Sequence, residues 1–158
     1  ESDNEIIDVI ETNIDNMNPE IYPHITVKLM ENNALDAYLT NIIMKKGRPA
    51  IKLTVLAETE DTGKLSDIIF NETTTLGIRI YQAKRKKLER TIKTIKTKYG
   101  NIKVKISKLN GEIKNIMPEY EDCKKAALKY KVPLRKIYEA VEFSANKKFK
   151  RLTSFISS

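Results

Sequence analysis

The sequence has few of the residues on which many enzyme sites depend. Its 158 residues include one cysteine, one histidine, five glycines and no tryptophan. The single cysteine, Cys123, excludes an internal disulfide and an all-cysteine zinc site, and it favours a reducing, cytoplasmic setting. The single histidine, His24, excludes a multi-histidine metal centre. The few glycines form neither a Gly-x-Gly-x-x-Gly motif nor a Walker loop to hold phosphates.

Long apolar runs are also missing. No run exceeds three residues, as in Ile68-Ile69-Phe70, which excludes a membrane-spanning helix and the apolar stretch of a signal peptide. Hydrophobic residues nevertheless make up 41% of the chain and charged residues 32%. This composition is typical of a chain that folds around an apolar core.

Basic charge is concentrated in one block. Residues 1–83 carry 7 basic and 14 acidic side chains, whereas residues 84–114 carry 12 basic side chains against only Glu89 and Glu112. The block is consistent with a solvated, lysine-rich hairpin face. The alternative is binding of a polyanion, such as nucleic acid, nucleotide phosphates or an acidic partner.

Hydrophobic periodicity in the first half predicts the element order βαββαβ. Alternating or β-branched residues predict four strands, and apolar residues at every third or fourth position predict two helices. That order is the ferredoxin-like, or split βαβ, arrangement of the α+β class, with both helices on one face of the sheet. The other face then lacks a cover, so we expect self-association. The predicted strands are residues 6–14, 35–44, 51–55 and 76–80; the predicted helices are residues 18–32 and 62–69.

The second half predicts a basic β-hairpin region and then two helices. Asn110-Gly111 is a strong hairpin-turn signal, and Pro118 begins a helix whose apolar positions are Cys123, Ala127 and Tyr130. Val132-Pro133 separates it from a second helix. We therefore expect three parts: a nucleotide-binding core at 1–85, a basic hairpin region at 86–117, and a helix pair with its tail at 118–158.

Two polar segments of the first half are candidates for phosphate binding. Lys45, Lys46 and Arg48 surround a tight hairpin turn, where their charges would converge on phosphates or simply discourage edge pairing. A threonine run at a helix-to-strand junction offers hydroxyl and backbone donors, or it is a plain strand entry. The run comprises Thr73, Thr74 and Thr75, followed by Arg79.

Two further segments contain carboxylates that are candidates for binding a ligand or a metal ion. Asp15, in the polar loop after the first strand, is placed to hold a hard divalent ion or to form an Asx turn. Glu119, Glu121 and Asp122 lie in the first turn of a predicted helix, where the helix dipole alone is sufficient to explain them. Cys123 is interpreted as a small core residue.

Five separated blocks resemble the C-terminal domain of the LarC family, the nickel-insertion enzymes of nickel-pincer nucleotide cofactor synthesis. The likeness runs from about Ile7 to Val141, and Asn16 stands where the family usually has aspartate. The family's larger N-terminal domain is absent from this chain. The blocks are ETNIDNMNPEIY at 11–22, NALDAYLTNIIMKKGRPA at 33–50, IIFNETTTLGIR at 68–79, MPEYEDC at 117–123 and VPLRKIYEA at 132–140.

The resemblance implies an enzyme of the lyase class that inserts Ni²⁺ into pyridinium-3,5-bisthiocarboxylic acid mononucleotide, giving the cofactor of lactate racemase. It implies dependence on CTP, which is hydrolysed and bound with Mg²⁺ or Mn²⁺, and assembly as a trimer or hexamer. The metal would then lie near Asp15 and Glu72. The nucleotide-binding residues would be Lys45, Lys46, Arg48, Thr73, Thr74, Thr75, Arg79, Glu119, Tyr120 and Asp122.

Two other functions stay open from the residues themselves. The basic hairpin and the two terminal helices, whose spacing weakly resembles a helix-turn-helix, fit a nucleic-acid-binding module. An oligomer that senses a nucleotide without performing chemistry is the other alternative.

Overall fold

The structure is a computed structural model that describes residues 3–149. The described chain divides into two compact units, one of residues 4–86 and one of residues 87–149 together with Asp3. We call them the N-terminal unit and the C-terminal unit. In the described part of the chain, no helix combines the length and the apolar character needed to cross a membrane.

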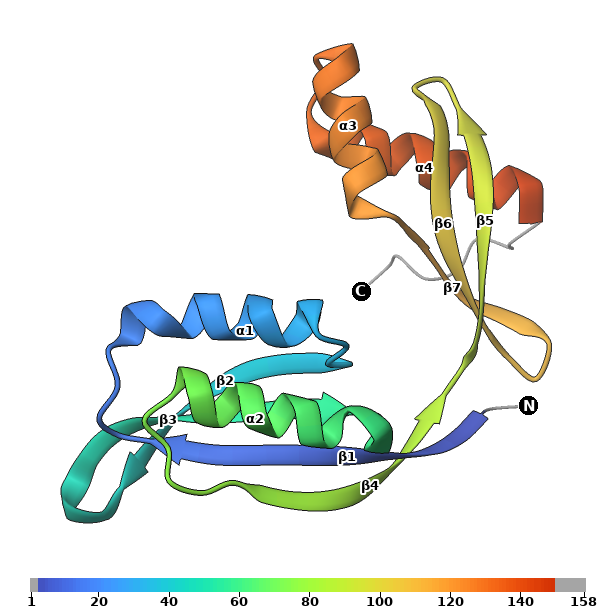
Figure 1. Cartoon of the computed structure of the whole chain (residues 1–158). Helices are drawn as coiled ribbons and strands as arrows, with labels where there is room; N and C mark the ends of the chain where they lie inside the picture. The colour runs from blue at the N-terminus through green and yellow to red at the C-terminus, as the bar shows by residue number, and fades with distance from the viewer. Residues whose placement is uncertain (1–2, 150–158) are drawn as a thin grey trace. The chain divides into compact units, whose positions relative to one another are not determined.

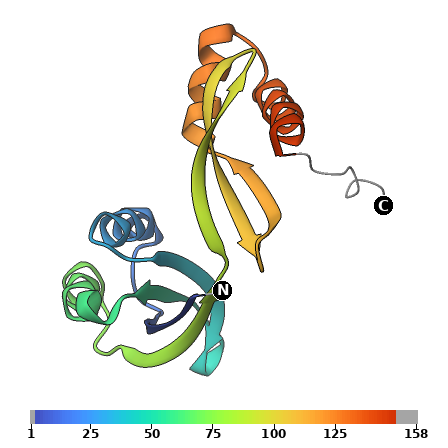
Figure 2. The same ribbon diagram turned by 90° about the vertical axis from the view of Figure 1, so that its right-hand side faces the viewer.

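The N-terminal unit is a four-stranded sheet with both helices on one face (Figures 1 and 2). The strand order is β2-β3-β1-β4, and β3 is antiparallel to both β1 and β2. The element order βαββαβ is the one that the sequence pattern predicts. The elements are β1 (Asp3–Ile14), α1 (Tyr22–Glu31), β2 (Asp36–Met44), β3 (Arg48–Ala57), α2 (Thr62–Glu72) and β4 (Arg79–Lys87), with short 3-10 turns at Pro19–Ile21, Lys45–Gly47 and Thr59–Asp61.

Apolar side chains from both helices and the central strands form the core of this unit. Ile10, Leu53 and Val55 of the sheet are fully buried against residues of α1 and α2. Ile10 lies opposite Val55 in the β1–β3 register, so both face the helices. The helices contribute Ile25, Leu29, Leu65 and Ile69.

The fourth strand begins later than the sequence pattern predicts. The alternation from Leu76 predicts a strand at 76–80, but β4 begins at Arg79, and Leu76 is fully exposed. Residues 75–77 are instead held by hydroxyl contacts: the Thr75 amide donates to Thr73 Oγ1 and the Thr75 hydroxyl donates to the Gly77 carbonyl. These local bonds satisfy the backbone without a strand partner.

The C-terminal unit is a three-stranded antiparallel sheet, in the order β5-β6-β7, with two helices packed on it (Figure 1). This differs from the separate hairpin region and helix pair that we expected, because strands and helices bury one shared core. Ile95, Ile102 and Val104 of the sheet pack with Ile137 and Val141 of the second helix. The elements are β5 (Glu89–Thr97), β6 (Gly100–Leu109), β7 (Glu112–Pro118), α3 (Tyr120–Tyr130) and α4 (Leu134–Phe149).

Residues with a left-handed backbone conformation form the β6–β7 turn and end α3 in this unit. Asn110 and Gly111 have φ of 51° and 80° between the paired residues Leu109 and Glu112, as the Asn-Gly signal predicts. Lys131, with φ of 51°, ends α3. On α3, Cys123 is buried as predicted, but Tyr130 is 42% exposed rather than turned into the core.

We expect Leu53→Ala to destabilise the N-terminal unit by about 2–5 kcal/mol, because it leaves a cavity beneath both helices. Urea unfolding followed by circular dichroism measures the change. The matched control is Leu76→Ala, which removes the same atoms from a fully exposed position and should stay within about 0.5 kcal/mol. Equal effects of the two substitutions would contradict this assignment of the core.

Candidate functional site

Three polar segments meet at one end of the N-terminal unit. They are residues 15–18 after β1, the β2–β3 turn at 45–48, and residues 73–78 before β4; we call them the loop cluster. Arg48 Nη1 lies 3.4 Å from Asp15 Oδ2, and the Thr74 hydroxyl donates to Asn16 Oδ1 at 2.6 Å. The fold therefore joins segments that are some 30 to 60 residues apart in the sequence.

A buried threonine holds the third segment against β1. The Thr12 hydroxyl lies 2.5 Å from that of Thr75, and each of the two lies 2.9 Å from the Gly77 carbonyl oxygen. Thr12 is 1% exposed, so these bonds satisfy a hydroxyl that water cannot reach. They give residues 75–77 a defined conformation beside the end of β1.

Arg79, at the start of β4 and directly after the loop cluster, contacts β1. Its Nη2 donates to Asn13 Oδ1 at 3.0 Å and lies 3.5 Å from Glu11 Oε2. Lys52 Nζ lies 3.1 Å from the other oxygen of Glu11. Burial alone would raise the pKa of the Glu11 carboxyl, but Lys52 and Arg79 hold that pKa below its ordinary value.

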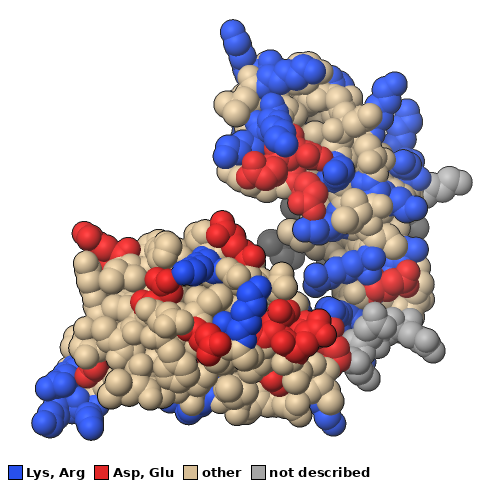
Figure 3. Space-filling view, in the orientation of Figure 1, with Lys and Arg blue, Asp and Glu red and all other residues tan. Residues whose placement is uncertain are grey.

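Lys45 and Lys46 lie in the exposed turn of the loop cluster. Lys46 has φ of 62°, and neither lysine has an ion pair within the described residues. In Figure 3 a group of Lys and Arg side chains gathers at the end of the N-terminal unit that carries the β2–β3 turn. Unlike Arg48, these two lysines therefore keep uncompensated charge at the tip of the hairpin.

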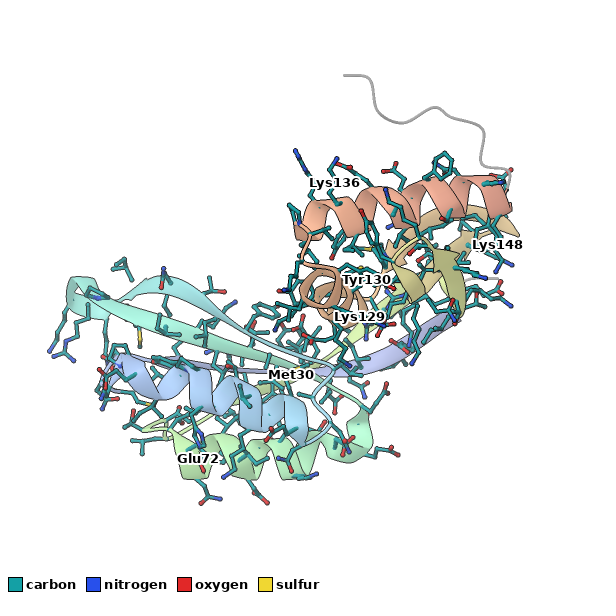
Figure 4. All side chains as sticks on the ribbon, turned by 90° about the horizontal axis from the view of Figure 1, so that it is seen from above. Met30, Glu72, Lys129, Tyr130, Lys136 and Lys148 are labelled. Atoms are coloured by element: carbon teal, nitrogen blue, oxygen red, sulfur yellow. The ribbon has the colours of Figure 1, made fainter. Side chains whose placement is uncertain are left out.

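Glu72, predicted as a metal ligand, lies at the end of α2 (Figure 4) and is engaged by two basic side chains, Lys28 and His24. Lys28 Nζ donates to Glu72 Oε1 at 2.6 Å, and His24 Nε2 lies 3.5 Å from Oε2. The hydrogen bond from Lys28, together with the charges of Lys28 and His24, lowers the pKa of the Glu72 carboxyl. Glu72 thus ties α2 to α1 and carries a charge that is already compensated.

A metal cage built from protein side chains is absent from residues 3–149. No cluster of three or more His, Cys, Asp or Glu side chains has the geometry to hold an ion there. Mg²⁺, however, commonly takes only one or two carboxylates and completes its shell with water and substrate phosphates. Asp15, whose partner Arg48 lies 3.4 Å away, fits that role better than Glu72, which would first have to release Lys28 from a 2.6 Å contact.

The remaining predicted residues lie in the C-terminal unit, at the start of α3. Glu119 Oε1 lies 2.8 Å from Lys105 Nζ, and Asp122 Oδ2 accepts a hydrogen bond from the Lys103 backbone amide at 3.0 Å. Tyr120 is 52% exposed. Glu119 and Asp122 thus connect α3 to β6, and the described contacts do not join them to the loop cluster.

The sequence pattern missed several polar residues of β1 that contact the segment before β4 or the start of β4. Thr12, Asn13 and Glu11 lie within the first strand, where the apolar pattern draws attention to Ile10 and Ile14 instead. One signal in the sequence could have revealed Thr12. This residue occupies a core-facing position of β1 between the buried residues Ile10 and Ile14, where an apolar residue is expected.

Comparison with known proteins assigns the chain to a family. A family model described as "Nickel insertion protein" matches residues 1–138. The chain belongs to the nickel insertion protein family. The family resemblance that the sequence blocks indicated is therefore confirmed.

Relatives in this family bear names that state a substrate. The chain is 53% identical over 133 residues to the pyridinium-3,5-bisthiocarboxylic acid mononucleotide nickel insertion protein of Acetivibrio thermocellus, covering 84% of this chain and 32% of that protein. It is 43% identical over 133 residues to the protein of the same name from a Thermotoga species, covering 84% of this chain and 33% of that protein. The chain spans about a third of the length of these curated relatives.

Two solved structures resemble this one. The first is described as LarC2, the C-terminal domain of a cyclometallase involved in the synthesis of the NPN cofactor of lactate racemase, in its apo form. It matches with a TM-score of 0.86 and 34% identity, covering 91% of this chain and 99% of that chain. A protein of Methanopyrus kandleri matches with a TM-score of 0.66 and 18% identity, covering 91% of both chains, and shows the fold alone.

We expect Glu11→Gln to lower the free energy of unfolding at pH 7 by up to about 1 kcal/mol, because it removes a carboxylate held by Lys52 and Arg79. The folded-state pKa of Glu11 lies below its unfolded value, so the stabilisation is present above the unfolded pKa and is lost as the pH falls through the folded pKa. The difference between variant and parent should therefore shrink below about pH 4.5. Thermal unfolding measured from pH 3 to pH 7 tests this expectation.

The matched control is Glu31→Gln, at an exposed carboxylate without an ion pair in the described part of the chain. It should leave the stability and its pH dependence close to those of the parent. A difference for Glu11→Gln that stays constant from pH 3 to pH 7 would contradict the role of the charge.

Proposed function

We propose that this chain is the nucleotide-binding part of an enzyme that inserts nickel into pyridinium-3,5-bisthiocarboxylic acid mononucleotide, giving the nickel-pincer cofactor of lactate racemase. The observation that carries the proposal is the continuous family likeness over residues 1–138. The TM-score of 0.86 to the C-terminal domain of a cyclometallase supports it. Nickel is a substrate of this reaction, and its bonds form to the sulfurs and a ring carbon of the mononucleotide.

The reaction consumes CTP, and the enzyme belongs to the lyase class. The phosphates of CTP bind at the loop cluster, where Lys45, Lys46 and Arg48 supply the positive charge. Arg48 is suited to bidentate contact and the lysines act as point charges. Thr73, Thr74, Thr75 and Arg79 complete the phosphate site. The uncompensated charge of Lys45 and Lys46 at the hairpin tip supports this assignment.

A divalent ion, Mg²⁺ or Mn²⁺, accompanies the triphosphate and neutralises part of its charge. Asp15 is the first candidate ligand, because its carboxylate lies at the loop cluster beside Arg48. Glu72 is the second candidate and exchanges Lys28 for the ion. The phosphate oxygens and water supply the other ligands, as is usual for Mg²⁺ bound with a nucleotide.

The start of α3 recognises a nucleotide base or the second nucleotide. Glu119 and Asp122 can accept a hydrogen bond from an exocyclic amine such as that of cytosine. Tyr120, which is 52% exposed, offers a ring for contact with a base. Both acids already hold groups of β6, which positions their carboxylates.

We further propose a ferredoxin-like N-terminal unit and a homo-oligomer, a trimer or hexamer, that covers the open face of its sheet. The strand order β2-β3-β1-β4, with both helices on one face, supports the ferredoxin-like description. The enzyme's N-terminal domain is a partner of this chain, since the relatives are about three times as long. A cytoplasmic location is consistent with Cys123, a buried free thiol whose pKa is raised by burial and by Asp122.

We expect Arg48→Ala to weaken CTP binding about ten- to hundredfold in the presence of Mg²⁺. Charge-assisted hydrogen bonds to phosphate contribute about 1.5–3 kcal/mol each, and 1.4 kcal/mol corresponds to a factor of ten. Isothermal titration of CTP into parent and variant measures the change.

Lys64→Ala is the matched control, because it removes an exposed cation from the same unit away from the loop cluster. It should bind CTP within about twofold of the parent. The double variant Lys103→Ala/Lys105→Ala removes charge from the C-terminal unit together with the Lys105–Glu119 ion pair, and it should weaken CTP binding much less than Arg48→Ala does. A loss only in the double variant would move the phosphate site to the C-terminal unit, and salt-sensitive binding of a DNA duplex without CTP binding would favour a nucleic-acid-binding module.

A further inference from the structure

The C-terminal unit contains a pocket built mainly from residues that the proposed CTP site does not use; Asp122 alone is shared with the residues proposed to recognise a base. The pocket has a volume of about 230 Å³ and lies between the β5–β6 turn and the face of α3 that runs from Asp122 to Tyr130. We call it the tyrosine pocket. The lining residues that matter for its chemistry are Tyr99, Asn101, Asp122, Lys125, Lys129 and Tyr130.

Two tyrosine rings form one side of the pocket. The ring centroids of Tyr99 and Tyr130 are 5.5 Å apart, with an angle of 64° between the planes, which is the edge-to-face arrangement that aromatic pairs prefer. Tyr130 is nevertheless 42% exposed. Part of its ring is therefore open to a ligand.

The turn that carries Tyr99 is held in place by a buried hydroxyl. Thr97, which is 8% exposed, donates from its hydroxyl to the Gly100 carbonyl at 2.9 Å and accepts a hydrogen bond from the Tyr99 amide at 3.0 Å. Gly100 has φ of 96°, which glycine adopts without strain. The Tyr99 backbone is thus positioned before any ligand arrives.

Both rings already attract cations. Lys98 Nζ lies 5.0 Å from the centroid of Tyr99. Lys129 Nζ lies 5.5 Å from the centroid of Tyr130, and Figure 4 labels both of these residues. These distances fall within the range of cation–π attraction. The ring faces are therefore electrostatically suited to a positively charged group.

Two lysines of the tyrosine pocket, Lys125 and Lys129, can bind an anionic group. Within the part of the chain that the structure describes, neither Lys125 nor Lys129 forms an ion pair with a carboxylate. The pocket's carboxylate, Asp122, is engaged by the Lys103 backbone amide. The pocket thus combines aromatic faces that attract cations with ammonium groups that attract anions.

We infer that the tyrosine pocket binds the pyridinium ring and thiocarboxylates of the mononucleotide substrate, an inference that rests on the proposed function. A pyridinium mononucleotide has a flat cationic ring with anionic thiocarboxylates and a phosphate. The ring replaces an ammonium group over Tyr130, and the released Lys129, with Lys125, pairs with the anionic groups. A cavity of about 230 Å³ is smaller than a typical pocket for a whole ligand, so it holds the ring end while the ribose phosphate lies outside.

Cation–π attraction also allows the tyrosine pocket to distinguish the pyridinium mononucleotide from CTP. Cytosine is neutral and gains no cation–π attraction from a tyrosine face. The tyrosine pocket therefore prefers the pyridinium nucleotide, while the loop cluster of the N-terminal unit supplies the charge for a triphosphate. Each unit then carries one nucleotide.

The test uses nicotinic acid mononucleotide as a stable probe, because it has a pyridinium ring, a carboxylate and a 5′-phosphate. CMP is the matched ligand with the same ribose phosphate and a neutral base. We expect the chain to bind the probe more tightly than CMP in calorimetric titration. Tyr130→Leu should weaken probe binding about tenfold, whereas Tyr130→Phe, which keeps the aromatic face, should stay within twofold.

Tyr81→Leu is the control, because Tyr81 is an exposed tyrosine of the N-terminal unit. It should bind the probe normally, and circular dichroism should show that α3 is intact in the Tyr130 variants. CTP binding by Tyr130→Leu should equal that of the parent, which separates a failure of this inference from a failure of the CTP site. Probe binding no tighter than CMP binding, unchanged binding by Tyr130→Leu, or equal losses in the Leu and Phe variants would overturn the inference.

Discussion

The antiparallel sheet of the N-terminal unit, with α1 and α2 packed against one face, brings the polar segments of the loop cluster together. Ile10, Leu53 and Val55 supply the buried surface of the sheet. β1 and β2 both run antiparallel to β3, so the loop after β1 and the β2–β3 turn lie at the same end of the unit. The Thr74–Asn16 hydrogen bond holds the segment before β4 at that end. The contact of Arg48 with Asp15 follows from that arrangement. The sheet and its apolar core thus position the polar side chains that carry the proposed phosphate site.

The two units differ in how their charged side chains are paired. In the N-terminal unit Glu11 is paired with Lys52 and Arg79, and Glu72 with Lys28. Uncompensated positive charge remains at the hairpin tip. In the C-terminal unit, basic side chains cover much of the face seen in Figure 3, and some of their ammonium groups lie over aromatic rings rather than beside carboxylates. Compensated pairs hold elements together, whereas Lys45 and Lys46 can bind an anion without losing a carboxylate partner. Arg48, by contrast, would exchange Asp15 for the anion.

This division bears on the proposed function, in which a short chain takes part in a reaction with two nucleotides. The chain spans about a third of its curated relatives, yet each of its units has its own core and its own cluster of polar side chains. A triphosphate with a divalent ion needs concentrated positive charge and one or two carboxylates, and the loop cluster offers both. A pyridinium ring needs an aromatic face, which the tyrosine pocket offers. The two requirements are met by different residue types and therefore by different sites.

The sequence by itself determined the element order of the N-terminal unit, the turn at Asn110-Gly111 and the family, because periodicity, turn chemistry and motif blocks are local properties of the chain. It also marked Arg48, Asp15 and the threonine run as candidates. Tertiary structure alone decided that Glu72 is held by Lys28, that Thr12 anchors residues 75–77, and that the expected hairpin region and helix pair share one core. It also decided that Tyr130 lies half open beside Tyr99 rather than in the core. These outcomes depend on pairs of residues far apart in the sequence, since burial and ion pairing are set by which elements pack together, and no local pattern records that packing.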